Sequence, residues 1–155
     1  MNHNEIINGL LKITKEKQDA CKAEINMLGK NHPTERGALQ LKAGIYNVAI
    51  AAGLIGGTDR SILLMSKRFG NLIKFFPELE SYYRELTGEE KENMEIALYP
   101  EIFMRLNFYN TYNNDLEAAE RFGDPQKIFQ ARIKKEVLCE ILEMWRNFRV
   151  ENDLF

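Results

Sequence analysis

Apolar residues recur at helical spacing along almost the whole chain of 155 residues, and this periodicity constrains the fold most strongly. Residues 3–28 show it best, as a seam close to the heptad period. The seam consists of Ile7, Leu11, Thr14, Gln18, Cys21, Ile25 and Leu28. No segment alternates apolar and polar residues as a half-buried strand does. The sequence therefore predicts an all-α fold, a single-domain helical bundle of five or six helices over residues 1–155.

Glycine, proline and capping residues divide this pattern into separate helices. Further helices are predicted over 35–55, 59–74, 78–87, 101–122 and about 125–151. Their boundaries are marked by Gly29, Thr34, Gly56, Gly57, Gly123, Asp124 and Pro125. A capping box of Thr87 and Glu90 starts one more helix, which meets Pro100. Because proline lacks a backbone donor and clashes with the preceding turn, we expect a break or kink there.

Residue patterns in three of the helices predict how they pack. Small residues recur every four positions within 35–55, which lets another helix approach closely. They lie on two lines, one with Gly44, Val48 and Ala52 and one with Ala49 and Gly53. The inward face of 101–122 is predicted to consist of Ile102, Leu106, Tyr109, Asn113 and Leu116. In the first helix, polar Thr14 and Gln18 weaken the seam, and they would suit a homodimer seam that sets register.

The formal net charge of −2 offers no strong global attraction to nucleic acid or to an acidic membrane surface. The charge is segregated, however, because residues 33–77 carry +4 and residues 78–123 carry −7. These two regions can pair inside the molecule, or one of them can face a partner. Cys21 and Cys139 form no disulfide framework, so a reducing, cytoplasmic location is expected. We expect the N-terminal residues not to be a signal peptide and no segment to span a membrane.

The sequence offers little to a catalytic, metal or cofactor site. The stretch AIAAGLIGGTDRSI at 49–62 lacks the preceding strand and the lysine of a phosphate loop, so a corner between helices is the favoured interpretation. The only histidines are His3, near the terminus, and His32, in a loop. Cys21 and Cys139 are interpreted as small hydrophobic residues on apolar seams. We expect no enzyme activity, no metal site and no cofactor.

The segment 59–74 carries basic and amide side chains opposite its apolar stripe. This candidate partner or nucleic-acid face consists of Arg60, Lys67, Arg68, Asn71 and Lys74. As the second helix of a helix-turn-helix pair, it would reach phosphates and base edges. The preceding turn, from Gly53 to Ile62, is long for that motif, and the whole chain is acidic. A solvated basic face, or one docked on the acidic residues 78–95, is the competing interpretation.

The segment 103–115 is rich in tyrosine and asparagine, although asparagine is a mediocre helix former. A candidate ligand or interface patch within it consists of Asn107, Tyr109, Asn110, Tyr112 and Asn113. Aromatic area combined with amide hydrogen bonds can shape a ligand pocket or a protein-binding surface. The competing interpretation is a helix whose aromatic side faces the core while its asparagines meet water.

These features favour a small protein–protein interaction protein: an adaptor, an inhibitor or an accessory subunit that binds another protein through a helical face. One alternative is a nucleic-acid-binding regulator that uses residues 59–74. A second alternative is a small-ligand binder at residues 103–115. A homodimer through the seam of the first helix is also predicted.

Overall fold

A computed structural model describes residues 3–56 and 76–153, so the helix predicted over 59–74 lies outside the described residues. Within them, every regular element is helical, which confirms the all-α fold. The α-helices are α1 (His3–Leu28), α2 (Pro33–Gly56), α5 (Glu80–Glu85), α6 (Gly88–Met104), α7 (Asn110–Phe122) and α8 (Pro125–Glu151). Short 3-10 helices cover Gly29–Asn31 and Pro77–Leu79, and a π-helical turn at Arg105–Tyr109 joins α6 to α7.

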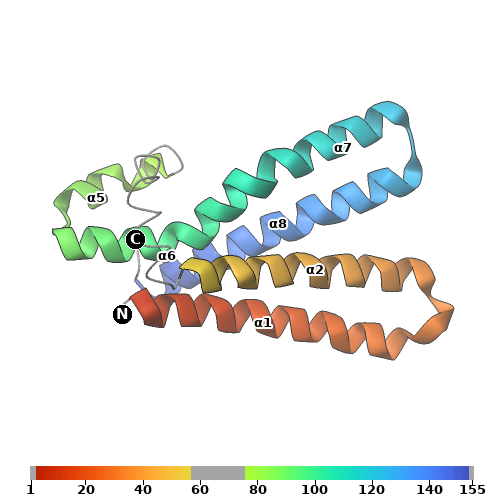
Figure 1. Cartoon of the computed structure of the whole chain (residues 1–155), viewed down its shortest axis with the longest axis horizontal. Coiled ribbons are helices and arrows are strands. Elements are labelled where there is room, and N and C mark those ends of the chain that lie inside the picture. Colours follow the sequence, from red (N-terminus) through yellow and green to blue (C-terminus); the bar gives the residue numbers. More distant parts are fainter. Residues whose placement is uncertain (1–2, 57–75, 154–155) are drawn as a thin grey trace.

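The long helices form two antiparallel hairpins, α1 with α2 and α7 with α8 (Figure 1). Helix α2 is the central member, because it packs against α1, α8 and α6. Helices α6 and α7 form one continuous helical path, which changes direction between them (Figure 1). None of the described helices is both long enough and apolar enough to cross a membrane.

Most helix boundaries follow the local signals in the sequence. Gly29 and Gly123 adopt left-handed backbone angles, with φ of 64° and 68°, directly after α1 and α7. The Asp124 carboxylate accepts hydrogen bonds from the backbone N–H groups of Gln126 and Lys127, and the predicted capping box precedes α6. The predicted N-cap at Thr34 is wrong. Helix α2 already begins at Pro33, because proline suits the first helical position.

Of the break or kink predicted at Pro100, the break is wrong. Helix α6 runs through Pro100 as far as Met104, and the irregular turn comes after it, at Arg105–Tyr109. Leu98 and Ile102 flank the proline and are 0% and 5% exposed, so both sides of it are anchored in the core. Burial of these side chains compensates for the single backbone hydrogen bond that proline removes.

The π-turn also changes which residues of 101–122 face inward. A ladder of four aromatic rings crosses the turn, with centroid separations of 6.1, 6.2 and 5.6 Å between successive members; it consists of Tyr99, Phe103, Phe108 and Tyr112. The middle step is one residue longer than a regular helical step, and the π-turn accommodates that residue. The inward face predicted from a regular helix is therefore wrong at Leu106 and Tyr109, which are 50% and 41% exposed, whereas Asn113 and Leu116 are half-buried.

The seam of α1 faces the interior of the same chain. Thr14 and Gln18 are buried, and each has a hydrogen-bond partner on another helix. Trp145 Nε1 of α8 donates to Thr14 Oγ1 at 2.9 Å, and Gln18 Nε2 donates to the carbonyl of Ala43 in α2 at 3.3 Å. The polar positions in the seam are therefore explained by contacts within the chain.

The two lines of small residues in α2 have different environments. A Cβ on Gly53 would lie 2.7 Å from Leu11 Cδ2 of α1, so this glycine permits a close approach of the two helices. Ala49, on the same line, is 0% exposed. By contrast, a Cβ on Gly44 would meet no atom within 4 Å, because this glycine is exposed. The predicted close approach is confirmed for the Ala49–Gly53 line and wrong for Gly44.

Candidate functional site

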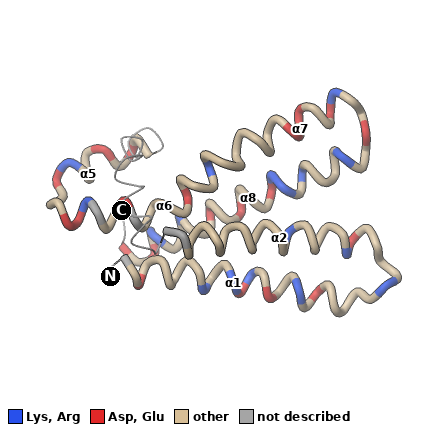
Figure 2. The backbone as a smooth tube through the Cα atoms, viewed as in Figure 1, with Lys and Arg blue, Asp and Glu red and all other residues tan. Residues whose placement is uncertain are grey.

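The basic face predicted on 59–74 lies outside the described residues, so its hypothesis rests on the sequence alone. This applies to Arg60, Lys67, Arg68, Asn71 and Lys74. The acidic region that could pair with it, within 78–123, forms α5, α6 and α7. Acidic residues are frequent on α5 and on the start of α6 (Figure 2). Pairing between the basic region and the acidic region stays a prediction.

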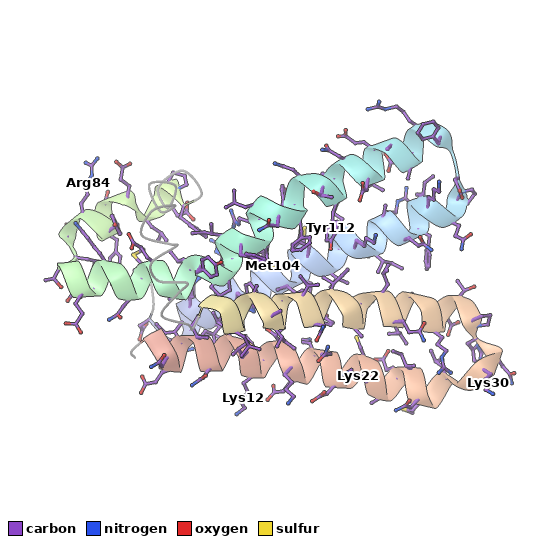
Figure 3. All side chains as sticks on the ribbon, viewed as in Figure 1. Lys12, Lys22, Lys30, Arg84, Met104 and Tyr112 are labelled. Atoms are coloured by element: carbon purple, nitrogen blue, oxygen red, sulfur yellow. The ribbon has the colours of Figure 1, made fainter. Side chains whose placement is uncertain are left out.

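The residues of the tyrosine–asparagine patch differ in exposure, and a ligand or interface role for the patch stays a prediction. Tyr112 packs on the core and points from α7 toward α8 (Figure 3), and burial raises the pKa of its hydroxyl. Tyr109 and Asn110 are exposed. Asn113 is half-buried, and its Oδ1 accepts no hydrogen bond from the described residues. The competing interpretation was a helix whose aromatic side chains face the core while its asparagines meet water. The positions of Tyr112 and Asn110 agree with this interpretation, whereas the exposed Tyr109 does not.

Asn107 has a structural role in the π-turn. Its Nδ2 donates to the carbonyl of Phe103 at 2.8 Å, and its own carbonyl accepts from Thr111 Oγ1 at 3.3 Å. A π-turn displaces the regular i to i−4 backbone bonds, and these side chains supply partners to the carbonyls involved. A short polar side chain is therefore useful at this position even though asparagine is a mediocre helix former.

The cysteines and histidines give no catalytic constellation within the described residues. Both cysteines are free, and Cys139 is exposed rather than on an apolar seam as predicted, because it lies on the outer face of α8. Burial, followed by the charge of Glu24, raises the pKa of the Cys21 thiol, which opposes formation of a nucleophilic thiolate. Residues 3–56 and 76–153 contain no group of three side chains that could hold a metal ion.

A buried ion cluster joins α6, α8 and the residue before Pro77. Arg149 donates to Glu101 Oε1 through Nε at 3.1 Å, and a second guanidinium nitrogen lies 2.9 Å from the same oxygen. Arg105 approaches Glu101 Oε2 at 3.9 Å. The ring of Phe76 contacts both guanidinium groups, with centroid distances of 4.9 Å to Arg105 and 5.5 Å to Arg149. Burial raises the pKa of Glu101, and both arginines oppose that shift.

This cluster was missed by the sequence reasoning, although one signal was available. Arg149 follows Trp145 by four positions, so it continues the buried stripe of α8. A charged residue on such a stripe predicts a buried partner, because an unpaired buried charge is costly. The cluster is closed by Phe76, which is 1% exposed, and its contacts anchor helices to each other. We therefore assign it a structural role.

An apolar region of the surface lies where the two hairpins end. One hollow of about 610 Å³ lies between the end of α1 and the start of α2, and a second of about 570 Å³ lies between the starts of α2 and α8. Phe129 lines both hollows together with Thr34 and Ala38. Met27, at the rim, is 86% exposed, and Phe129 is 44% exposed. We call this region the hairpin-end surface; its apolar lining consists of Met27, Leu28, Pro33, Ala38, Leu39, Leu41, Pro125, Phe129 and Ile133.

The second hollow exists because α2 presents small side chains to α8 at this end. Thr34, Gly37 and Ala38 line it, and a Cβ on Gly37 would meet nothing within 4 Å. Its ten lining residues include no Asp, Glu, Lys or Arg. No short sequence motif marks the hairpin-end surface, because its residues come from α1, α2 and α8.

Comparison with models of protein families, with curated proteins and with solved structures gave no match.

Proposed function

We propose that this protein is a protein–protein interaction protein that binds a segment of another protein at the hairpin-end surface. The observation that carries the proposal is the pair of adjoining hollows that share Phe129, with the 86% exposed Met27 lining one of them. Contiguous exposed apolar surface of this kind marks binding sites, because water solvates it poorly. An adaptor, an inhibitor and an accessory subunit would each use this docking step.

The chemistry of the lining defines the chemistry of the partner. The hollow between α2 and α8 is lined without charged residues, so it favours apolar side chains of the bound segment. The hollow beside Met27 adds Glu24 and Glu35 at its edge, where a basic or hydrogen-bonding group of the partner would remain solvated. Phe129 lies between the two hollows and would be the anchor, since aromatic side chains dominate the energy of such interfaces.

We propose a cytoplasmic location on the basis of the two free cysteines. A half-buried Cys21 and an exposed Cys139 persist as thiols in a reducing compartment.

Two glycines of α2 provide a matched pair of test variants. Gly37 lines the hairpin-end surface, whereas Gly44 is exposed elsewhere on the same helix, and a Cβ meets nothing within 4 Å at either position. Replacing each by glutamate should therefore preserve the fold and raise the free energy of unfolding by about 0.5–1 kcal/mol, because glutamate is the better helix former. Only Gly37→Glu places a charge in the uncharged hollow.

The test is quantitative capture of proteins from an extract of the native host on immobilised parent and variants. We expect at least one protein to be captured equally by the parent and by Gly44→Glu, and to be lost with Gly37→Glu. Identical capture by all three would show that the hairpin-end surface is not the docking site. Capture that disappears after nuclease treatment would favour the nucleic-acid alternative instead.

A further inference from the structure

A second groove, distinct from the hairpin-end surface, runs between α1 and α8. Its volume is about 540 Å³. Its apolar floor is formed by Ile13 of α1 and by Met144 and Phe148 of α8, all of them half-buried. The lining of α8 extends from Glu140 to Glu151, which is about 16 Å at the helical rise. A groove of this length accommodates roughly three turns of another helix.

Gly9 and Tyr46 set the shape of the groove, because Gly9 positions a residue of its floor and Tyr46 positions a residue of its rim. A Cβ on Gly9 would lie 2.8 Å from Phe148 Cε2, so the glycine allows the phenyl ring to lie directly over α1. Tyr46 of α2 donates from its hydroxyl to Glu140 Oε1 at 3.1 Å, which orients that carboxylate at the groove. The floor is therefore set by helix packing, and part of the rim is held by a hydrogen bond.

The rim of the groove is acidic. Four carboxylates line it, from Glu16 of α1 and from Glu140, Glu143 and Glu151 of α8. Lys17 is the single basic residue among the lining residues, which leaves them with a charge of −3. The whole chain carries only −2, so this groove is far more acidic than the average surface. Acidic groups around an apolar floor complement a helix with an apolar stripe flanked by lysine or arginine.

We propose that the groove between α1 and α8 docks a basic amphipathic helix of a partner protein. The apolar stripe of that helix packs on Ile13, Met144 and Phe148, and its basic side chains pair with the carboxylates of the rim. Met144 suits this role because an unbranched thioether adapts to different apolar partners. This inference does not depend on the hairpin-end surface, so each can fail alone.

The probe is a synthetic peptide of about 15 residues, or four helical turns, built from leucine, lysine and alanine with leucines on one face. A second peptide replaces every lysine by glutamate, and a third scrambles the order of the first. We expect the parent protein to bind only the amphipathic lysine peptide, measured by fluorescence anisotropy, and more weakly as salt is added. In methyl NMR spectra, the signals of Ile13 and Met144 should shift on binding.

Charge reversal tests the location of the peptide. Glu143→Lys with Glu151→Lys should weaken binding at least about tenfold, because two ion pairs become repulsive. Glu78→Lys with Glu117→Lys is the matched control, since both residues are exposed and lie outside the groove lining. It changes the net charge equally and should alter affinity less than about twofold.

Three results would each overturn the proposal. Equal weakening by both double variants would indicate only general attraction to an acidic protein. Binding of the scrambled peptide as tightly as the amphipathic one would show that the apolar floor is not used. Binding without shifts of the Ile13 and Met144 methyl signals would place the peptide elsewhere. The variant Gly37→Glu should bind the lysine peptide like the parent, which separates this test from that of the hairpin-end surface.

Discussion

At the scale of single residues, the interior of this protein is defined by a few buried polar contacts. Thr14 Oγ1 accepts from Trp145 Nε1 at 2.9 Å and donates to the carbonyl of Leu10 at 2.6 Å. Thr14 and Trp145 are 0% and 1% exposed. These bonds fix α8 against α1 in one register, because a buried indole N–H without an acceptor is destabilising.

Replacing Thr14 by valine preserves the shape of the side chain and removes the acceptor of Trp145. We expect Thr14→Val to lower the free energy of unfolding by about 1–3 kcal/mol, the cost of an unsatisfied buried donor. Chemical denaturation measures this loss. In a Trp145→Phe background the same substitution should cost clearly less. An equal cost in both backgrounds would contradict the role given to the hydrogen bond.

Arg149→Met should be more damaging, because it leaves the buried Glu101 with Arg105 alone at 3.9 Å. We expect a loss of about 3–5 kcal/mol at neutral pH, as for other broken buried pairs. The pKa of Glu101 already lies above its ordinary value of 4.5 and should rise further without Arg149. When the pKa of a carboxyl is raised in the folded state, the protonated form favours folding. This contribution to stability is complete below the ordinary pKa and is lost as the pH rises through the pKa of the folded state.

The penalty of Arg149→Met should therefore be smaller near pH 4.5 than at neutral pH. Urea denaturation of parent and variant at both pH values tests this, and a penalty independent of pH would refute it. The double variant Arg149→Met with Glu101→Met should recover part of the stability, because apolar side chains need no charged partner.

At the scale of elements, the π-turn is the feature with the largest consequence. It places one additional residue between Phe103 and Phe108 and keeps the aromatic ladder of α6 and α7 on one line. Removing one residue from it should convert the turn to a regular helix without rotating either flank.

We therefore expect deletion of Asn107 to change the free energy of unfolding by no more than about 1 kcal/mol. Deletion of Glu136, an exposed residue in the regular helix α8, is the matched control. It rotates Val137 and Leu138 relative to one half of α8 and should abolish cooperative unfolding, because a helical residue occupies about 100° of rotation. Thermal unfolding followed by circular dichroism compares the two. Equal damage from both deletions would show that the π-turn has no such tolerance.

At the scale of the whole molecule, the homodimer stays a prediction, but the buried part of the α1 seam is already covered within the chain. Ile7 is 3% exposed, and the seam packs on α2 and α8 within the chain. We expect Ile7→Asp to unfold the protein, since a charge in the core costs several kcal/mol. Light scattering of the parent at tens of micromolar tests the dimer, and a mass of 18.0 kDa would exclude it at that concentration.

The sequence by itself determined the all-α fold and most helix boundaries. Gly29, Gly123, Asp124 and the capping box at Thr87 act within a few residues of their own position, so their effect is readable locally. Both α1 and α8 accordingly span the predicted residues, His3–Leu28 and Pro125–Glu151.

Only the tertiary structure decided which faces are buried and where the surfaces open. The extra residue of the π-turn, the bond from Trp145 to Thr14 and the pairing of Arg149 with Glu101 each depend on residues of different turns or helices. The same holds for both grooves, whose linings combine residues far apart in the sequence. Helical periodicity specifies which residues share a stripe, but the packing of neighbouring helices selects which part of each stripe is covered.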